Sequence, residues 1–556
     1  MDFLLPIVHA FLLMIWNILA LSFAWVLVAL GQPALSMPLS VLAACLGYGL
    51  FFYAIRDLNK PFHRFGVGTI WFALVQAVQL YWFVAHPYLY IWAVYILLCL
   101  MMGAQFGVIA WLSDQERIKR GGVALALSGL WVLLEWSRLF VLSGFSWNPI
   151  GLSLAATLYP LQTASIAGVY GLSFWVMWTN LTFYKAVLYK TRVRTWILWA
   201  ILTTLPYLIG FGLMTYHEQK MKEANPREHT SLLVQTAFPI EECLGCKPDE
   251  LRVYVLGEWR QILRTLAPHK KERVDLVALP EYVVPFGTWS PVFSWKEVKS
   301  LFEDYWGSDA ALVLPPLEEP WAHFRNGEWW VSNAFILQGI ANHFSADVIA
   351  GLEDAEQKAD RIEHYNAGIY FEPWRYGADK RYSKRVLVPM GEYIPFEWCR
   401  KMALSYGIGG SFTPGEKAEV IQGTSGRYGL SICYEETYGD LMRENKLMGA
   451  EVLVNLTSDV WYPNSNLPKQ HLEHARLRAT EMGLPLIRAC NTGVTCGIDS
   501  LGREVGTLGD DEWYQGALKV KLPLYSYWTL YSATGDIYLL SFSGLLVLVL
   551  VLRRKG

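Results

Sequence analysis

The sequence predicts a membrane bundle of eight helices joined to one large α/β domain, and two observations carry this prediction. Hydrophobic residues make up 53% of the 556 residues and charged residues only 17%, against about 25% in an ordinary globular domain. The apolar and charged residues are also separated along the chain. Long apolar runs fill the stretch from Phe3 to about Leu213, and a charged, mixed stretch follows from about His217 to Tyr531.

Each membrane span is predicted from an apolar run of about 17–25 residues, the length that crosses the hydrocarbon core as a helix. The N-terminus lacks the basic segment and small-residue cleavage site of a removable signal peptide, so the first run is expected to stay as an anchor. The eight predicted spans are Phe3–Leu30, Leu39–Ile55, Val67–Val84, Leu89–Leu112, Val123–Leu142, Pro160–Tyr184, Trp196–Leu213 and Ile537–Leu552.

Basic residues in the loops orient these spans, because cytoplasmic loops are enriched in Lys and Arg. The loops Gly31–Pro38 and Ser143–Pro149 carry neither residue type. All basic segments fall on one side if both termini are cytoplasmic, so the region between the last two spans is expected outside the cytoplasm. The basic residues are Arg56, Lys60 and Arg64, then Arg117, Lys119 and Arg120, then Lys185, Lys190, Arg192 and Arg194, and finally Arg553, Arg554 and Lys555.

The region between the last two spans is predicted to be an α/β domain. Short apolar runs suited to buried strands recur there, and stretches with helical spacing such as His471–Met482 lie between several of them. Alternating signals of this kind indicate helices that cover the faces of a sheet. The predicted strands are Ser231–Val234, Val274–Leu279, Asp347–Gly351, Gly429–Cys433, Glu451–Leu456 and Leu486–Ala489.

Three residues at or near predicted strand ends suggest nucleophilic catalysis: Glu281, Lys384 and Cys433. Taken singly, each is more often a buried, capping or solvated side chain than a catalytic one. Together they fit one reaction. A cysteine attacks as thiolate and needs a neighbouring base or cation. A desolvated carboxylate can be that base, and a Lys with a backbone N–H can stabilise an oxyanion.

The strings around these residues carry a resemblance to known families. Leu279-Pro280-Glu281, Tyr382–Pro395 around Lys384, and Gly429–Glu435 around Cys433 resemble the motifs of nitrilase-type carbon–nitrogen hydrolases, in the same chain order. With spans before and after the domain, the chain resembles the bacterial apolipoprotein N-acyltransferases. Further matching strings are Glu135-Trp136-Ser137-Arg138, Ser143–Trp147, Asn491–Thr495 and Thr534-Gly535-Asp536.

The resemblance implies a fold, a reaction and a location. The domain is expected to be an extracytoplasmic α-β-β-α sandwich, with residues 1–216 as a seven-span bundle, 217–531 as the catalytic domain and 532–556 as the last span and basic tail. It implies acyl transfer from a phospholipid to a diacylated apolipoprotein through a cysteine thioester. The expected setting is the bacterial cytoplasmic membrane, as a monomer among membrane lipid, without cofactor or metal.

The resemblance also assigns roles to residues of this chain. Glu281 would be the general base, Lys384 the oxyanion partner and Cys433 the nucleophile. Supporting or substrate-binding roles are implied for Glu392, Tyr434, Glu435 and Trp461. Glu135 and Arg138, charged residues inside an apolar span, are either a structural ion pair or a membrane-side functional pair.

Three positions depart from the family pattern, and one segment is longer than usual. Met390 stands where the family has Phe, Pro463 where it usually has Gly, and Phe238-Pro239 where a Trp is expected. The stretch between Glu281 and Val348 is long and rich in Trp. We expect it to be either a lid that dips into the bilayer or an extra loop with a small core of its own. Its Trp residues include Trp289, Trp295, Trp306, Trp321, Trp329 and Trp330.

Other signals are weaker. Cys243 and Cys246 could form a local disulfide, and so could Cys490 and Cys496. No second ligand pair is spaced for zinc. His471 and His474 lack the H-E-x-x-H pattern and are expected to be polar surface or packing residues. The formal net charge of −2 gives no reason to expect a nucleic acid partner.

Two other functions remain open from the sequence. One is a membrane-anchored amidase, although a soluble substrate would not explain so many spans. The other is a non-catalytic transporter or scaffold, against which the intact Glu281, Lys384 and Cys433 argue.

Overall fold

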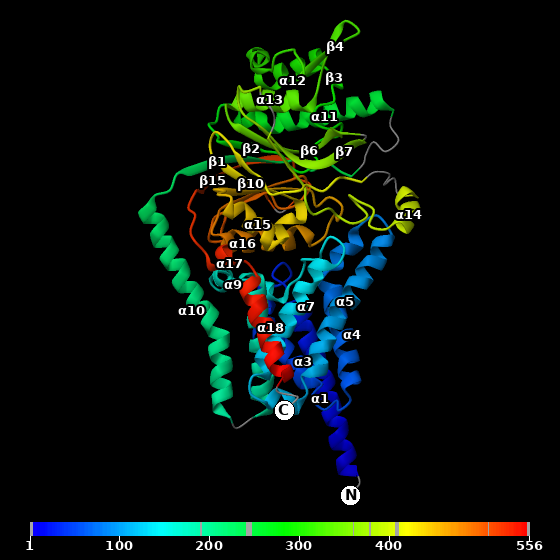
Figure 1. Ribbon diagram of the computed structural model, residues 1–556, viewed down its shortest axis with the longest axis vertical. Helices are drawn as coiled ribbons and strands as arrows, with labels where there is room; N and C mark the ends of the chain where they lie inside the picture. Colours follow the sequence, from blue (N-terminus) through cyan, green and yellow to red (C-terminus); the bar gives the residue numbers. More distant parts are fainter. Residues whose placement is uncertain are drawn as a thin grey trace. The chain divides into compact units, whose positions relative to one another are not determined.

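The chain divides into two units, which we describe separately. The computed structural model describes residues 4–189, 192–240, 247–359, 361–376, 380–405, 411–509 and 511–552. The first unit is Met1–Lys220 with Thr529–Gly556, and the second is Met221–Trp528 (Figure 1). The three-part division predicted at residues 216 and 531 stays a proposal. Cys243 and Cys246, and the basic tail, lie outside the described residues.

Helices build the first unit, and one or more of them covers each apolar run predicted as a span. The elements, in chain order, are α1 (Leu4–Ala29), α2 (Met37–Leu42), η1 (Ala43–Gly47), α3 (Tyr48–Ala54), α4 (Pro61–Gln79), η2 (Tyr81–Ala85), α5 (Tyr90–Leu112), α6 (Gln115–Lys119), α7 (Val123–Ser137), η3 (Arg138–Phe140), η4 (Ile150–Ser153), α8 (Leu158–Leu161), α9 (Ala164–Leu188), α10 (Val193–Ala224), α17 (Leu530–Thr534) and α18 (Ile537–Leu552).

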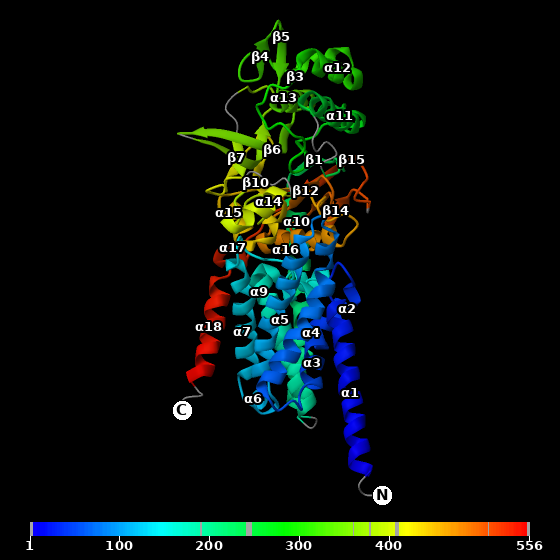
Figure 2. The ribbon, with the colours of Figure 1, turned by 90° about the vertical axis from the view of Figure 1, so that its right-hand side faces the viewer.

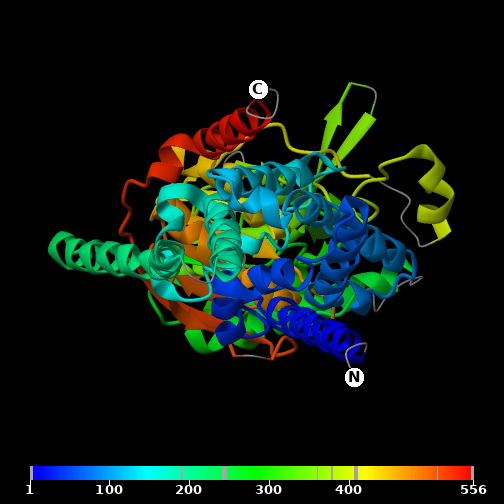
Figure 3. The same ribbon diagram turned by 90° about the horizontal axis from the view of Figure 1, so that it is seen from below.

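Several of these helices are apolar enough to cross a membrane. Among the described residues, length and composition select four: Met37–Ala54, Tyr90–Leu112, Val123–Phe140 and Val193–Ala224. Met14–Ala29 and Ile537–Leu552 are shorter apolar helices. The least buried of the four is α10, which leans away from the other helices of its unit in Figures 1 and 3. The first unit is therefore a membrane bundle, and the full set of eight spans stays a proposal.

Close helix packing in this unit depends on a small residue. Gly129 of α7 faces Ser543 of α18, and a Cβ at position 129 would lie 3.0 Å from the Ser543 carbonyl oxygen. The two helices lie side by side in Figures 1 and 2. Small residues allow such close approach in membrane bundles, where van der Waals packing holds the helices together.

The second unit contains two six-stranded sheets. The first has the order β15-β1-β2-β6-β7-β8 and the second β14-β13-β12-β11-β10-β9. In each, three central strands run parallel, and the flanking strands run antiparallel to their neighbours. The first sheet consists of β1 (Glu228–Gln235), β2 (Leu276–Ala278), β6 (Asp347–Lys358), β7 (Arg361–Phe371), β8 (Lys380–Ser383) and β15 (Gly516–Pro523). The second consists of β9 (Val420–Gln422), β10 (Arg427–Ile432), β11 (Val452–Thr457), β12 (Leu486–Cys490), β13 (Cys496–Ile498) and β14 (Glu504–Thr507).

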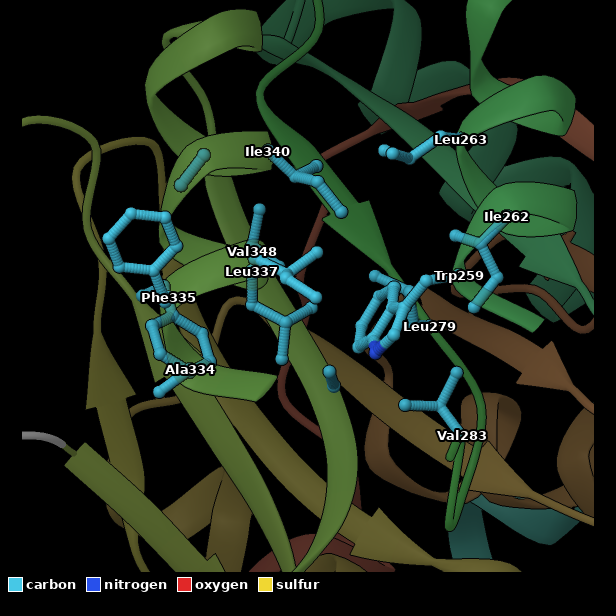
Figure 4. Close-up of a cluster of buried hydrophobic side chains, with 14 of the residues drawn as sticks. Trp259, Ile262, Leu263, Leu279, Val283, Ala334, Phe335, Leu337, Ile340 and Val348 are labelled. Carbon is cyan, nitrogen blue, oxygen red and sulfur yellow. The ribbon is translucent and has the colours of Figure 1, made fainter. Parts of the chain in front are cut away.

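The two sheets pack face to face, and helices cover their outer faces. Apolar residues of both sheets, including Leu233, Ile349, Leu430 and Val454, form one buried cluster between them. A second cluster lies between the first sheet and two helices, α11 (Pro248–Leu266) and α13 (Asn333–Phe344) (Figure 4). On the outer face of the second sheet lie α15 (Gly439–Leu447) and α16 (Leu467–Met482) (Figure 1). The layers are helix, sheet, sheet and helix.

The Trp-rich insert between Glu281 and Val348 is a folded subdomain. It contains β3 (Phe293–Ser294), α12 (Trp295–Trp306), η6 (Ser308–Val313), β4 (Ala322–Arg325) and β5 (Glu328–Val331), with the strands in the order β3-β5-β4. Trp306 and Trp321 are buried in the cluster beneath α13, and Trp289, Trp295 and Trp329 pack against it. The insert therefore shares the apolar core between the first sheet and its covering helices and has no separate core among the described residues, and a lid role stays a prediction.

Candidate active site

Glu281, Lys384 and Cys433 meet in the second unit at strand ends that come from both sheets. Glu281 follows β2 and Lys384 follows β8 in the first sheet, whereas Cys433 follows β10 in the second. Lys384 Nζ lies 2.9 Å from Glu281 Oε1, and the two residues are 1% and 7% exposed. Both charged groups act electrostatically on the Cys433 sulfur. The fold therefore gathers three residues that lie far apart in the sequence.

Glu392 and Asn366 frame the Glu281–Lys384 pair. Lys384 Nζ also donates to Glu392 Oε1 over 3.0 Å. Asn366 Nδ2, on β7, donates to Glu281 Oε1 over 2.8 Å and to Glu392 Oε1 over 2.7 Å. The Val388 backbone N–H donates to Glu392 Oε2 over 2.8 Å. Both hydrogen bonds that we find for Glu281 among the described residues end on Oε1, so Oε2 is left to receive a proton.

A glycine lets the Glu281 backbone lie directly on the neighbouring strand. Gly351 of β6 donates its backbone N–H to Pro280 O over 3.0 Å. A Cβ at position 351 would lie 2.5 Å from Glu281 Cα, closer than any side chain allows. The absence of a side chain at Gly351 therefore fixes where Glu281 can stand.

Cys433 occupies a sharp turn that the adjacent strand supports. It begins the 3-10 helix η8 (Cys433–Thr437) with φ +55°, a left-handed conformation that is uncommon for a residue other than Gly. Such conformations persist when the surrounding structure holds them and are frequent at active sites. Asn455 Nδ2, on β11, donates to Cys433 O over 3.0 Å and to Ser431 Oγ over 3.1 Å. Asn455 thus holds the turn that carries the thiol.

Glu435 joins the Cys433 turn to the segment that carries Lys384. Its side chain is fully buried. Oε1 accepts the backbone N–H groups of Arg385 and Val386, at 2.6 and 3.0 Å. Oε2 accepts Tyr382 Oη at 3.0 Å and the Ile432 backbone N–H at 2.8 Å. With four donors on two oxygens, this carboxylate fixes the distance between the strands that end at Lys384 and Cys433.

The other two predicted supporting residues, Tyr434 and Trp461, both follow the thiol in the sequence. Tyr434 follows Cys433, and its hydroxyl donates to Leu387 O over 3.0 Å. Lys384 Nζ lies 5.7 Å from the centre of the Tyr434 ring. Trp461 is half-buried in the loop after β11.

Burial and charge set the protonation of the site. Burial raises the pKa of Glu281; the positive charge of Lys384 opposes this and the negative charge of Glu392 adds to it. Burial alone would lower the pKa of Lys384, but the carboxylates of Glu281 and Glu392 raise it well above its ordinary value. Burial and then Glu281 raise the pKa of the Cys433 thiol. Cys433 is therefore a thiol at rest, with a cation and a strengthened base beside it.

Sequence reasoning assigned no role to Asn366 or Asn455, although the string Asn455–Trp461 stands out after a predicted strand. Each is a fully buried amide within a strand whose neighbours are apolar. A polar residue inside a run of buried-strand type was the available signal, since such a group needs a partner. The sequence could not show which partner, because Asn366 and Glu281 are 85 residues apart.

Glu135 and Arg138 lie in the first unit and are both buried. Arg138 Nη1 is 3.9 Å from Glu135 Oε1, and Arg138 Nε donates to Gln105 Oε1 over 2.7 Å. Glu135 Oε1 accepts the Ile150 backbone N–H over 2.8 Å. The pair thus connects α7 to α5 and to the start of η4.

The structure decides two expectations, one for His471 and His474 and one for Cys490 and Cys496. His471 and His474 are buried, so neither is a surface residue. His471 lies 3.0 Å from Glu436 Oε1 and 3.1 Å from Asp459 Oδ1, which makes it part of a buried charge cluster. Cys490 and Cys496 are both free thiols. Within the described residues, no group of three or more His, Cys, Asp or Glu is arranged to hold a metal ion.

Comparison with known proteins agrees with the two-part organisation. The sequence model of the carbon–nitrogen hydrolase family matches residues 249–524, and that of the apolipoprotein N-acyltransferase N-terminal domain matches residues 24–182. A solved carbon–nitrogen hydrolase from Helicobacter pylori aligns with 53% of this chain and 89% of its own at 18% identity, with a TM-score of 0.31.

Curated relatives match over nearly the whole length. The apolipoprotein N-acyltransferase of Chlamydia pneumoniae is 33% identical over 531 residues, which cover 92% of this chain and 93% of the relative. That of Chlamydia trachomatis is 32% identical over 540 residues, covering 93% of each chain. With both family models matched and this coverage, the chain belongs to the apolipoprotein N-acyltransferase family.

Proposed function

We propose that this protein N-acylates the N-terminal diacylglyceryl-cysteine of apolipoproteins, with a phospholipid as acyl donor. The observation that carries the proposal is the buried cluster of Glu281, Lys384 and Cys433 in a chain of this family. The cluster supplies a base, a cation and a nucleophile, which are the three groups that acyl transfer through a thioester requires.

In the first half-reaction the enzyme takes the acyl group. Oε2 of Glu281 accepts the thiol proton as the Cys433 sulfur attacks the ester carbonyl of the phospholipid. Lys384 and a backbone N–H at Tyr434 stabilise the tetrahedral oxyanion. The intermediate collapses when the C–O bond breaks. The lysophospholipid oxygen takes the proton from Glu281 and leaves, and the acyl group remains on Cys433 as a thioester.

In the second half-reaction the acyl group passes to the acceptor. The free α-amine of the lipidated cysteine attacks the thioester carbonyl, and the same oxyanion forms. Glu281 accepts a proton from the nitrogen, the C–S bond breaks, and Cys433 leaves as a thiolate that is reprotonated from Glu281. The product is an amide, and the enzyme returns to its resting state. Burial of the site favours this route, because water would hydrolyse the thioester.

The supporting residues hold these groups in place. Glu392 balances the charge of Lys384 and, through Asn366, aligns Glu281. Glu435 joins the Cys433 turn to the Lys384 segment. The hydrogen bond from the Tyr434 hydroxyl to Leu387 O fixes Tyr434, whose own backbone N–H is the proposed oxyanion donor. Trp461 lines the approach to the site. Glu135 and Arg138 stabilise the bundle through their contacts with α5 and η4.

The proposed topology has eight spans and both termini in the cytoplasm of a bacterium. The four basic segments support it, since all fall on one side in this arrangement. The catalytic domain, residues 217–531, is then outside the cytoplasmic membrane, between the seventh span and the eighth. The protein acts as a monomer. A lipid ester and a lipidated amine both reach such a site from the bilayer, which explains why a hydrolase-like domain carries so many spans.

The test is to observe both half-reactions. Full-length protein in detergent is incubated with a phospholipid of defined acyl chains, and the mass of the Cys433 peptide is measured. A diacylated lipopeptide is then added. We expect an acyl mass on Cys433 that moves to the lipopeptide amine, no adduct with Cys433→Ala, and a full adduct with the matched control Cys399→Ala, which removes a different buried thiol. No adduct on the wild type refutes the proposal, and an acyl group that only water removes indicates a hydrolase.

A further inference from the structure

Thr457 lies beside the nucleophile at the end of three parallel strands. The register pairs Ile432 of β10 with Leu456 of β11, so the next position of β11, Thr457, is beside Cys433. Thr457 itself pairs with Cys490 of β12. Its side chain is fully buried. The Thr457 hydroxyl is therefore level with Cys433 and Cys490 across the three neighbouring strands.

The direction of the neighbouring side chain supports this position. Side chains alternate along a strand, so Asn455 and Thr457 share one face of β11. Asn455 reaches the carbonyl oxygen of Cys433 over 3.0 Å. Thr457 is two positions beyond Asn455 and is the last residue of β11, level with the start of the Cys433 turn.

The Thr457 hydroxyl lacks the partner that a buried hydroxyl usually has. Within the described residues, Thr457 Oγ1 has no hydrogen-bond partner at a normal distance and angle. Buried hydroxyls are rarely left without one, because the loss of water must be compensated. The group it does affect is the Cys433 thiol, whose pKa it lowers. These observations fit a hydroxyl that donates a hydrogen bond to the Cys433 sulfur when the sulfur is negatively charged.

We propose that Thr457 is a further catalytic residue, whose hydroxyl donates a hydrogen bond to the Cys433 sulfur whenever that sulfur carries negative charge. This rests on the proposed function only in taking Cys433 as the nucleophile. Thr457 keeps its proton throughout. It donates to the sulfur as Glu281 removes the thiol proton, loses an effective acceptor while the sulfur is bound in the thioester, and donates again when the amine displaces the sulfur as a thiolate.

The charges around the sulfur explain why such a donor is needed. Glu281 and Asp459 both face it with negative charge and disfavour a thiolate. Lys384 is the opposing cation, but its Nζ is already hydrogen-bonded to Glu281 and Glu392. A neutral hydroxyl stabilises the thiolate without adding a charge that would alter Glu281.

The test compares Thr457→Val, which removes the hydroxyl at similar volume, with Thr457→Ser, which keeps it. Thr480→Val is the matched control, because Thr480 is equally buried and its hydroxyl donates to the Arg476 carbonyl. Full-length variants in detergent are alkylated with iodoacetamide from pH 6 to pH 10, and modification of the Cys433 peptide is followed by mass spectrometry. Acyl-enzyme formation from phospholipid is measured in parallel.

With Thr457→Val we expect the alkylation profile of Cys433 to move to higher pH and acyl-enzyme formation to slow by roughly tenfold or more, the effect of losing a hydrogen bond to a charged group. The rate of acyl-enzyme formation with Thr457→Ser should stay within about threefold of the wild-type rate. Thr480→Val should leave the pH profile of Cys433 alkylation unchanged. If Thr457→Val does not fold, Thr457→Ala takes its place.

An unchanged alkylation profile in the variant without the hydroxyl overturns the proposal, as does a Ser variant as slow as the Val variant. Alkylation needs no lipid, so it tests Thr457 even if the wild type forms no acyl-enzyme. A wild type that is alkylated normally but forms no acyl-enzyme would count against the proposed function and not against the role of Thr457.

Discussion

Glu281, Lys384 and Glu392 form a chain of hydrogen-bonded charges with Lys384 Nζ at its centre, in which Glu281 and Lys384 are buried and Glu392 is half-buried. The pKa of Glu281 is raised by burial, and Glu392 raises it further while Lys384 acts against both. A carboxylate with a raised pKa is a stronger base, which is what removal of a thiol proton requires. In the proposed mechanism, Glu392 therefore acts through the pKa of the neighbouring base Glu281 and does not touch the substrate.

A prediction follows for Glu392→Gln. Removing this negative charge lowers the pKa of Glu281. The unprotonated carboxylate is the active form and exists above that pKa, so the acidic limb of acyl-enzyme formation should move to lower pH by roughly one pH unit. The maximum rate should fall, because the base is weaker. Single-turnover acylation between pH 4 and pH 9 measures both effects.

The control for this substitution is Glu272→Gln, which removes an equal charge from a carboxylate that pairs with Lys519 on the surface. Its profile should match the wild type. An acidic limb that moves to higher pH with Glu392→Gln would contradict the assigned role of Glu392.

The sequence predicts the three residues that the fold brings together, but not the residues that hold them in place. Glu281, Lys384 and Cys433 stand in recognisable strings after apolar runs. Asn366 stands between apolar residues and Thr457 directly follows an apolar run, and neither residue type by itself indicates a catalytic role. Their importance depends on which strands become neighbours, and strand pairing is decided by contacts distant in sequence.

At the scale of elements, the predicted strands are the ones that are buried on both sides. β1, β2, β6, β10, β11 and β12 are central and parallel to a neighbour, and strands in that position read as continuous apolar runs. β8, β9 and β14 are edge strands, and most of their residues are half-buried or exposed. Their short or mixed patterns, such as Lys380–Ser383, do not differ from those of loops.

The contact of α7 with α18 leads to a prediction for Gly129→Leu. A Leu side chain at this position meets the Ser543 backbone and must separate the two helices. Overpacking of this kind destabilises by about 1–3 kcal/mol. We expect a lower midpoint of thermal unfolding for the full-length protein in detergent. Gly544→Leu, one residue beyond Ser543 and in open space, should leave the midpoint close to that of the wild type. Equal effects of the two substitutions would exclude a specific helix contact.

At the scale of the whole molecule, the charge pattern of the loops predicts the orientation of the chain. Leu312 in the insert is 79% exposed, and the side chain of Glu116 in a basic loop is 78% exposed. In cells with a permeable outer membrane, Leu312→Cys should react with a membrane-impermeant maleimide. Glu116→Cys should react only after the inner membrane is broken.

Labelling is scored above that of the parent chain, which contains cysteines of its own. The reverse pattern would place the catalytic domain in the cytoplasm and refute the proposed topology.

β15 has a consequence for the order of events during synthesis. This strand is formed by Gly516–Pro523 and pairs along the full length of β1, in the sheet that positions Glu281 and Lys384. Its residues Val520 and Leu522 belong to the core between the sheets. The ribosome therefore adds all three reacting groups well before the strand that completes their scaffold. The sheet that places Glu281 and Lys384 therefore gains its last strand only after the whole segment that carries Cys433 has been synthesised.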